Sequence, residues 1–241
     1  MKTHEWTAES RFALYYVPAR DSAWWRAGCE WLARDPESDE ALVPPTLPAL
    51  TARSRDVASL TRAPRRYGWH GTLVAPARRA PGVTPDEVLN EARAWARRQR
   101  PFELAVEAAA LGQFAAIRPA TDDGDAAMRG LAADGLRELA CLRAAPNENE
   151  RQRRLDGHLS ARQRELLDLW GYPYVLEEFR FHMTLSDSID AHDRAAIVDW
   201  WSAHLPALGP LEIDTAAVFV ERSPGTPFAL VARLPFEGRD I

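Results

Sequence analysis

The sequence predicts an α+β fold in which two pseudo-symmetric lobes, each with an antiparallel sheet, enclose a central cleft. The first observation is a repeated motif, His70-Gly71-Thr72-Leu73 and His182-Met183-Thr184-Leu185. The second is that strand, helix, strand and strand follow in the same order from each copy. The third is a helical segment between them that has no counterpart in the first half. We expect one bilobal domain, with lobe 1 at 11–119, a helical insert at 120–174 and lobe 2 at 175–241.

In the first half, aromatic and β-branched residues before Pro18 predict the opening strand. Thr84-Pro85-Asp86-Glu87 is a strong helix start, with Thr84 as cap and Pro85 at the first position. Five prolines between residues 35 and 66 predict mostly loop, with a short helix near 53–60. We expect strands at 11–17, 67–74, 102–111 and 114–118, and helices at 23–34 and 84–99.

In the second half, helical periodicity over 125–142 starts the insert, and Ser160 caps a helix over 161–170 that Gly171 ends. After the second motif, Asp190 or Asp193 begins a helix that ends near residue 204. We expect the last two strands at 211–221 and 228–234.

Each motif has the alternation of a strand, in which successive side chains point to opposite faces. His70 and Thr72 therefore share one face, while Trp69, Gly71 and Leu73 take the other, apolar face. His182 and Thr184 share a face in the same way, and Arg180 joins them. An isolated copy would be best explained as a half-buried strand histidine satisfied by a neighbour, but the repeat favours a functional site.

Two imidazoles that face each other across a cleft suit a reaction that removes one proton and delivers another. Hydrolysis of a phosphodiester is such a reaction, because attack and departure occur on opposite sides of phosphorus. The hydroxyls of Thr72 and Thr184 would donate to the phosphate, and Arg180 is the best-placed cation. Ligand sets typical of a metal site are lacking in the sequence, so neither a metal nor a cofactor is expected.

Composition predicts an ordinary globular protein of 241 residues with a net charge of −5. Cys29 and Cys141 have no metal-ligand spacing and fit a reducing compartment. No apolar run is long enough to span a membrane, so we expect a cytoplasmic protein without a membrane partner. The negative charge makes nucleic acid the less favoured partner and a small phosphorylated substrate the more favoured one. The oligomeric state stays open.

The paired motifs resemble those of the 2H phosphoesterase superfamily, and the wider context resembles its DUF1045 branch, which is described in connection with phosphonate metabolism. The stretches that carry this resemblance are 64–76 (PRRYGWHGTLVAP), 151–155 (RQRRL) and 170–185 (WGYPYVLEEFRFHMTL). The resemblance implies a 2H phosphoesterase-like fold with catalytic roles for His70 and His182. It implies phosphate-binding roles for Thr72 and Thr184.

We therefore expect a metal-independent phosphodiesterase that hydrolyses a small cyclic phosphate, for which the resemblance suggests a phosphoribosyl cyclic phosphate. Two alternatives remain open: an RNA-end 2′,3′-cyclic phosphodiesterase or 2′-5′ RNA ligase-like enzyme, and a non-catalytic nucleotide-binding module. Polar residues that flank the motifs or lie in the charged part of the insert are candidates for binding the substrate. They are Arg180, Tyr67, Arg66, Tyr172, Tyr174 and Arg154.

Overall fold

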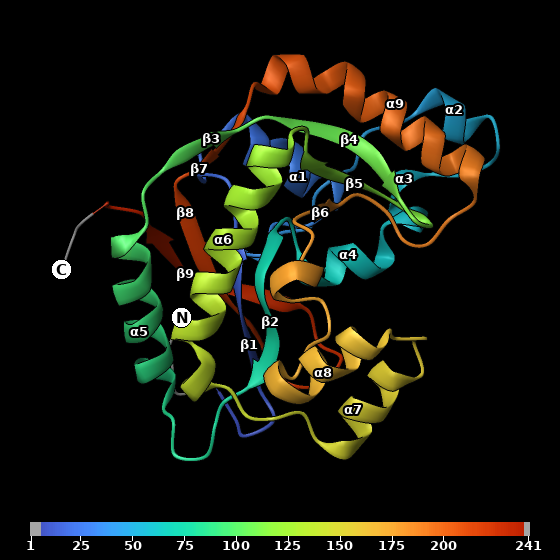
Figure 1. Cartoon of the computed structure of the whole chain (residues 1–241). Helices are drawn as coiled ribbons and strands as arrows, with labels where there is room; N and C mark the ends of the chain where they lie inside the picture. Colours follow the sequence, from blue (N-terminus) through green and yellow to red (C-terminus); the bar gives the residue numbers. More distant parts are fainter. Residues whose placement is uncertain (1–5, 239–241) are drawn as a thin grey trace.

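The structure, a computed structural model, describes residues 6–238 (Figure 1). Seven strands form one antiparallel sheet in the order β4-β5-β6-β2-β1-β8-β9, and β3 pairs with β7 in a second, two-stranded sheet. The strands are β1 (Arg11–Tyr16), β2 (Gly71–Arg78), β3 (Phe102–Leu104), β4 (Val106–Leu111), β5 (Phe114–Pro119), β6 (Met183–Thr184), β7 (Leu211–Ile213), β8 (Thr215–Glu221) and β9 (Phe228–Pro235).

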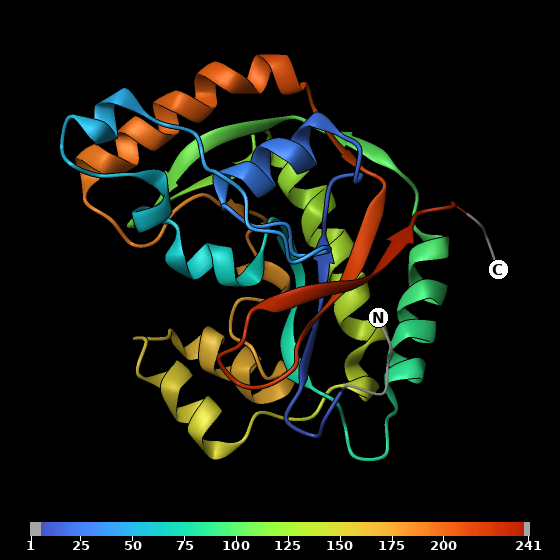
Figure 2. The same cartoon turned by 180° about the vertical axis from the view of Figure 1, so that it is seen from behind.

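Helices cover the sheet and fill the insert. They are α1 (Ala23–Trp31), α2 (Pro48–Thr51), α3 (Val57–Leu60), α4 (Arg62–Tyr67), α5 (Pro85–Arg98), α6 (Asp122–Glu138), α7 (Glu148–Leu155), α8 (Ala161–Trp170) and α9 (Ala191–Leu208), with 3-10 turns η2 (Ala140–Leu142) and η3 (Leu176–Glu178). Figure 2 shows the same arrangement from behind, and in both views α7 and α8 lie on the other side of β2 from α5. Within residues 6–238, no helix combines the length and apolar character needed to cross a membrane.

The repeated order of elements is confirmed. The first copy runs β2, α5, β3, β4, β5, and the second runs β6, α9, β7, β8, β9. The expected strand after the helix, 102–111 in the first copy and 211–221 in the second, is broken by one residue at the same place, Ala105 and Asp214. The short strands β3 and β7 pair with each other, so corresponding elements of the two copies meet.

The α+β class with antiparallel sheets is confirmed, whereas the division into two lobes stays a prediction. The main sheet joins the two halves of the chain, because the first-copy hairpin β4–β5 pairs with the second motif strand β6. The second-copy hairpin β8–β9 pairs with β1, which lies beside the first motif strand β2. The helical insert, α6 to α8, lies between these strands in sequence.

Several boundaries differ from the sequence-based expectation around the first motif. The residues expected to begin the strand at 67 instead end helix α4, and Gly68 turns the chain with a φ of 80°. Strand β2 continues past Pro76, because its register with β1 shifts between Phe12 and Leu14. Such a bulge accommodates a proline, which lacks the N–H that a regular ladder needs.

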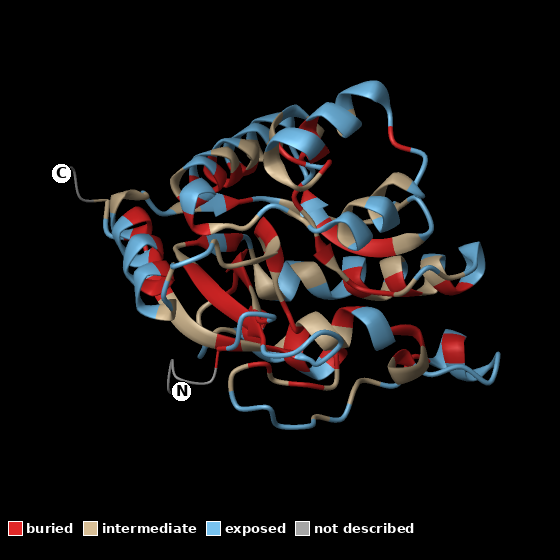
Figure 3. Ribbon diagram, turned by 90° about the horizontal axis from the view of Figure 1, so that it is seen from below, coloured by how far each residue is buried: buried red, intermediate tan, exposed pale blue. Residues whose placement is uncertain are grey.

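Buried residues follow the central strands, and exposed residues cover the outer faces of the helices (Figure 3). Under α9, the rings of Trp69 and Trp201 stack with centroids 5.6 Å apart. A side chain at Gly28 of α1 would meet the ring of Trp69 within 2.1 Å, so this helix packs on the motif only because residue 28 is glycine. The apolar side of the first motif is thus fixed in the core.

Candidate functional site

The two motif strands are neighbours in the sheet, which corrects the expectation that they face each other across a cleft. Gly71 of β2 is the antiparallel partner of Met183 of β6. That register places His70 beside Thr184 and Thr72 beside His182. Side chains directly opposite each other are about 5 Å apart at Cβ, and diagonal ones roughly 7–8 Å. The four motif side chains therefore form a square with the two imidazoles at opposite corners, which we call the motif square.

His70 is held in one orientation. Its Nδ1 lies 2.8 Å from the carbonyl oxygen of Gly68, and because a carbonyl can only accept, Nδ1 carries the hydrogen. Its ring stacks on Tyr15 with centroids 3.9 Å apart. In the neutral ring, Nε2 therefore keeps its lone pair, and the Thr72 hydroxyl lies 3.3 Å from it. This is the arrangement of a histidine able to accept a proton at Nε2.

His182 repeats this arrangement in the second copy. Its Nδ1 lies 2.8 Å from the carbonyl oxygen of Arg180, two residues earlier, as Gly68 precedes His70. Its ring lies beside Phe114, with centroids 5.5 Å apart. Both histidines thus donate from Nδ1 to the carbonyl at position −2 and leave Nε2 available to a ligand.

Both imidazoles are neutral near pH 7. Burial outweighs the hydrogen bond to Gly68 and, with a smaller contribution from the charged form of His182, lowers the pKa of His70 to about 4. Burial also lowers the pKa of His182, against the hydrogen bond to Arg180. A neutral pair can accept a proton from a ligand, and an anionic ligand would raise both pKa values by favouring the charged form.

This pKa shift gives a test based on stability. The ordinary pKa of histidine is 6.5, and that of His70 in the folded chain is about 4. Between these two pH values, His70 binds a proton in the unfolded chain but not in the folded one. The contribution of His70 to the unfolding free energy is therefore most favourable above pH 6.5 and is lost as the pH falls towards 4. We expect His70→Gln to lose less stability than the wild type between pH 7.5 and pH 5 in urea titrations. Equal losses would contradict the assigned shift.

Two cavities adjoin the motif square. One, of about 240 Å³, is lined by His70 and Thr184 together with Tyr67 and Ser186. The other, of about 430 Å³, is lined by Thr72 and His182. Phe114 borders both, so we treat them as one cleft whose two parts meet at the motif square. A cleft of this size suits a small molecule.

The cleft brings together four of the six residues expected to bind a substrate. Tyr67 borders the His70 side, and Tyr172, Tyr174 and Arg180 border the His182 side. The guanidinium of Arg180 donates through Nη1 to the carbonyls of Glu177 and Phe179, at 2.9 and 2.8 Å. Their roles toward a substrate stay predictions.

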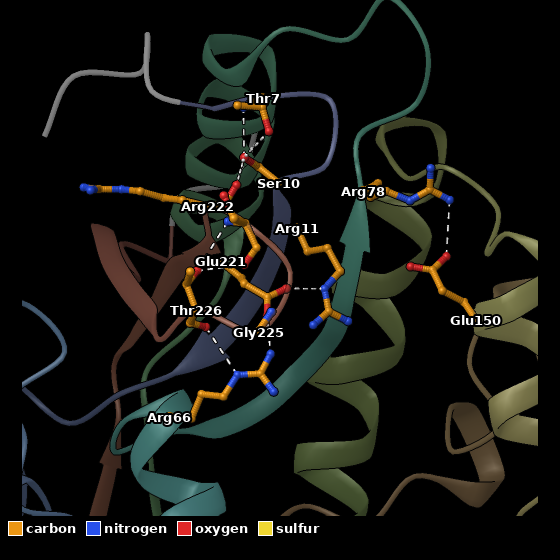
Figure 4. A network of polar contacts seen from close by, with 11 residues as sticks. Thr7, Ser10, Arg11, Arg66, Arg78, Glu150, Glu221, Arg222, Gly225 and Thr226 are labelled. Carbon is orange, nitrogen blue, oxygen red and sulfur yellow. Dashed lines mark hydrogen bonds and ion pairs between the residues drawn. The ribbon is translucent and has the colours of Figure 1, made fainter.

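The other two candidates lie beside the cleft. Arg66 forms an ion pair with Glu221, a carboxylate that Arg11 also binds at 2.5 Å (Figure 4). Burial alone would raise the pKa of the Glu221 carboxyl, but the hydrogen bonds from Arg11 and from the Gly225 N–H hold it below its usual value. Arg154 lies 4.7 Å above the ring of Tyr172 and borders a separate pocket.

A family model described as "Protein of unknown function (DUF1045)" matches residues 72–229. The chain belongs to the DUF1045 family. This match confirms the resemblance to the DUF1045 branch, and it covers Thr72, His182 and Thr184, while His70 lies just before its first residue. Membership of the wider superfamily stays a prediction.

Two relatives of this DUF1045 chain carry the same name, ribose 1,5-bisphosphate phosphokinase PhnN. The protein from Janthinobacterium sp. (strain Marseille) is 37% identical over 95% of this chain and 51% of its own length. The protein from Laribacter hongkongensis (strain HLHK9) is 36% identical over 91% of this chain and 50% of its own length. The chain thus spans about half the length of the curated relatives it matches.

These names contradict the prediction of a phosphodiesterase. Both describe a phosphokinase, which transfers a phosphoryl group, whereas we expected a hydrolase that cleaves a cyclic phosphate diester. The same comparison shows that the predicted enzyme class, a phosphoric diester hydrolase, is wrong. The prediction of a small phosphorylated substrate agrees with the sugar phosphate in the relatives' name.

Sequence patterns did not single out Tyr15 or Phe114, although both contact the motif histidines. Each lies in a strand that the sequence did predict, β1 or β5. Aromatic residues at these positions look like ordinary core residues, because only the strand order places them against an imidazole. The part of the chain described here, residues 6–238, shows no group of three His, Cys, Asp or Glu side chains placed to hold a metal ion.

Proposed function

We propose that this chain binds a phosphorylated ribose at the motif square and acts in phosphoryl transfer, the reaction class named for its relatives. The observation that carries the proposal is the motif square itself. Two neutral imidazoles and two hydroxyls converge from adjacent central strands on a cleft of small-molecule size. Thr72 and Thr184 donate to phosphate oxygens, and Nε2 of His70 lies 3.3 Å from the Thr72 hydroxyl.

We assign His70 the role of the base, because Gly68 and Tyr15 fix its ring and its lowered pKa keeps Nε2 unprotonated. During transfer, the acceptor oxygen loses its proton to Nε2 of His70 as its bond to phosphorus forms. The bond from phosphorus to the donor oxygen breaks, and that oxygen leaves with the electron pair. His182, once an anion has raised its pKa, donates a hydrogen bond to the transferred group.

The chain is suited to the sugar side of such a transfer. Its only lysine is Lys2, so it lacks the G-x-x-x-x-G-K-[ST] loop that cradles nucleotide phosphates in many kinases. We assign it the phosphorylated sugar, and ATP with Mg²⁺ is the phosphoryl donor to be tested. The PhnN name of the relatives supports a place for the chain in phosphonate metabolism.

Calorimetric titration tests the binding step without a donor. We expect ribose 1,5-bisphosphate and ribose 5-phosphate to bind the wild type, and Thr72→Val or Thr184→Val to weaken binding about tenfold, because a hydrogen bond to a charged group contributes about 1.5–3 kcal/mol. Thr51→Val, an exposed change in α2, is the matched control. Absence of binding at millimolar ligand, or equal affinities in all variants, would contradict the proposal.

Phosphorus NMR then tests the transfer step. With ribose 1,5-bisphosphate, ATP and Mg²⁺, we expect a sugar carrying a third phosphoryl group to form in step with ADP. ADP formation that does not depend on the sugar would show that the chain does not use the sugar as acceptor.

A further inference from the structure

A second polar pocket follows the cleft along strand β2. Thr72, Leu73 and Ala75 border the cleft, and the next part of the strand, Pro76 to Arg78, borders this pocket. Four arginines line it, with Glu150 as its one carboxylate among the described residues. We call it the arginine pocket; its arginines are Arg11, Arg78, Arg143 and Arg154.

The fold brings these arginines together from distant parts of the sequence. Arg11 and Arg78 are register partners on β1 and β2. The segment after η2 adds an antiparallel bridge to the end of β2, because Arg143 pairs with Arg79 and the Ala144 N–H donates to the carbonyl of Arg78 at 2.8 Å. Arg154, in the last turn of α7, completes the pocket.

Among residues 6–238, two of the four positive charges have a carboxylate partner. Glu221 binds Arg11, and Glu150 lies 3.2 Å from Arg78. Figure 4 shows these two ion pairs on different sides of β2. Arg154 lies over the ring of Tyr172, which is a cation–π contact rather than an ion pair. The pocket therefore keeps an excess of positive charge.

Arg143 differs from the other three arginines, because it has neither an ion pair nor a cation–π contact among the described residues, and this indicates a ligand. Its Nε is buried and has no hydrogen-bond partner among the described residues. Burial, together with the nearby charge of Arg154, lowers the pKa of Arg143 to about 10. A buried N–H without an acceptor, next to a second cation, destabilises the folded protein. An anion in the pocket would remove both penalties at once.

Contacts connect the arginine pocket to both histidines. On one side, the ring centroid of Tyr67 lies 6.1 Å from that of His70 and 5.0 Å from that of Phe228. The guanidinium carbon of Arg11 lies 5.8 Å from the ring centroid of Phe228. On the other side, Tyr172 borders the cleft with His182 and supports Arg154. Residues that line the cleft, Tyr67 and Tyr172, therefore also belong to the contacts that surround Arg11 and Arg154.

We propose that the arginine pocket binds the second phosphate of a bisphosphorylated ribose whose first phosphate lies at the motif square. This inference rests on the proposed function and extends it to the substrate class. The pocket has a volume of about 20 Å³, so the flexible guanidinium groups must move apart as the phosphate enters. Their planar forks then offer the paired N–H groups that suit phosphate oxygens.

Titration of ribose 1,5-bisphosphate and ribose 5-phosphate into Arg143→Gln tests the assignment. We expect the wild type to bind the bisphosphate at least about tenfold more tightly, because the second phosphate adds charge-assisted hydrogen bonds. Arg143→Gln should lose most of that advantage while its affinity for the monophosphate changes less than about twofold. Arg93→Gln, the same charge change on the exposed face of α5, is the control and should behave like the wild type.

A thermal melt without ligand separates a binding role from a structural one. Because the Nε of Arg143 has no acceptor in the described part of the chain, Arg143→Gln should keep or raise the melting temperature, whereas a structural arginine would lower it. An equal loss of affinity for both ligands, or no loss for either, would overturn the second phosphate site.

Inorganic phosphate keeps the test independent of the sugar. If neither ribose phosphate binds the wild type, the proposed function fails, and the pocket is then judged by phosphate alone, with chloride at matched ionic strength as control. Stabilisation of the wild type but not of Arg143→Gln would support an anion site there. Equal melting temperatures with and without phosphate would overturn it.

Discussion

Replacement of His70 with glutamine is expected to lower the rate of phosphoryl transfer to ribose 1,5-bisphosphate by about 10²–10⁴-fold, the usual contribution of a positioned base. Glutamine fills a similar volume but cannot take up a proton. His70 has the geometry of a base, because Gly68 fixes its Nδ1 hydrogen and Tyr15 fixes its ring. The measurement is kcat/KM across pH, followed by phosphorus NMR.

The fold of this variant should be intact. His70 is half-buried, so glutamine can replace it without leaving a large cavity. The replacement also removes a group whose lowered pKa costs stability below pH 6.5. His192→Gln changes an exposed histidine at the start of α9 and is the matched control. If His70→Gln kept near-wild-type kcat/KM, or if His192→Gln lost as much, His70 would not be the base.

The double variant with His182→Gln shows whether the two imidazoles act as a unit. Residues that work in one step have strongly non-additive effects on rate. We expect the double variant to be little slower than His70→Gln alone. A product of the two single effects would indicate that the histidines act in separate steps.

Local signals in the sequence predicted the motif residues and many helix boundaries. Thr84 and Ser160 begin α5 and α8 with a capping box, as their spacing to Glu87 and Gln163 indicates. Gly171 ends α8 in the left-handed conformation. These signals lie within a few residues of the boundary that they define, so a single sequence contains them.

The way the motifs meet could not be predicted in this manner. Strand β6 has two residues, Met183 and Thr184, and its place between β5 and β2 depends on pairings with residues far away in the chain. Alternation gave the correct face of each motif but did not say whether the strands oppose each other or lie side by side. The sheet order decides this, and it places His70 beside Thr184.

The arginine pocket was hidden for a similar reason. Arg11, Arg78 and Arg143 looked like members of an arginine-rich composition, because no local pattern distinguishes them. Only the bridge between Arg79 and Arg143 brings the insert against the end of β2. Arg154 drew attention through its charged neighbourhood, yet its contact with Tyr172 required the folded insert.

The geometry of the motif square also depends on a residue without a side chain, which leads to the second large expected effect. A Cβ at Gly71 would lie 2.3 Å from the ring of Phe181. Phe181 is buried and packs edge-on against Tyr16, so its ring has little freedom to move away. Because Gly71 is also the partner of Met183, a shift here separates the two motif strands.

Gly71→Ala should therefore lower the unfolding free energy by about 1–3 kcal/mol, the usual range for overpacking a core. Affinity for ribose phosphates should fall as well, because His70 and Thr184 would no longer share one phosphate. Gly130→Ala is the matched control: a Cβ at this exposed position of α6 meets nothing within 4 Å, and alanine favours a helix by about 0.5–1 kcal/mol. Urea titration of both variants should give opposite signs. If Gly71→Ala were as stable as the wild type and bound the sugar phosphate equally well, close packing of Phe181 on Gly71 would not be what holds the motif square together.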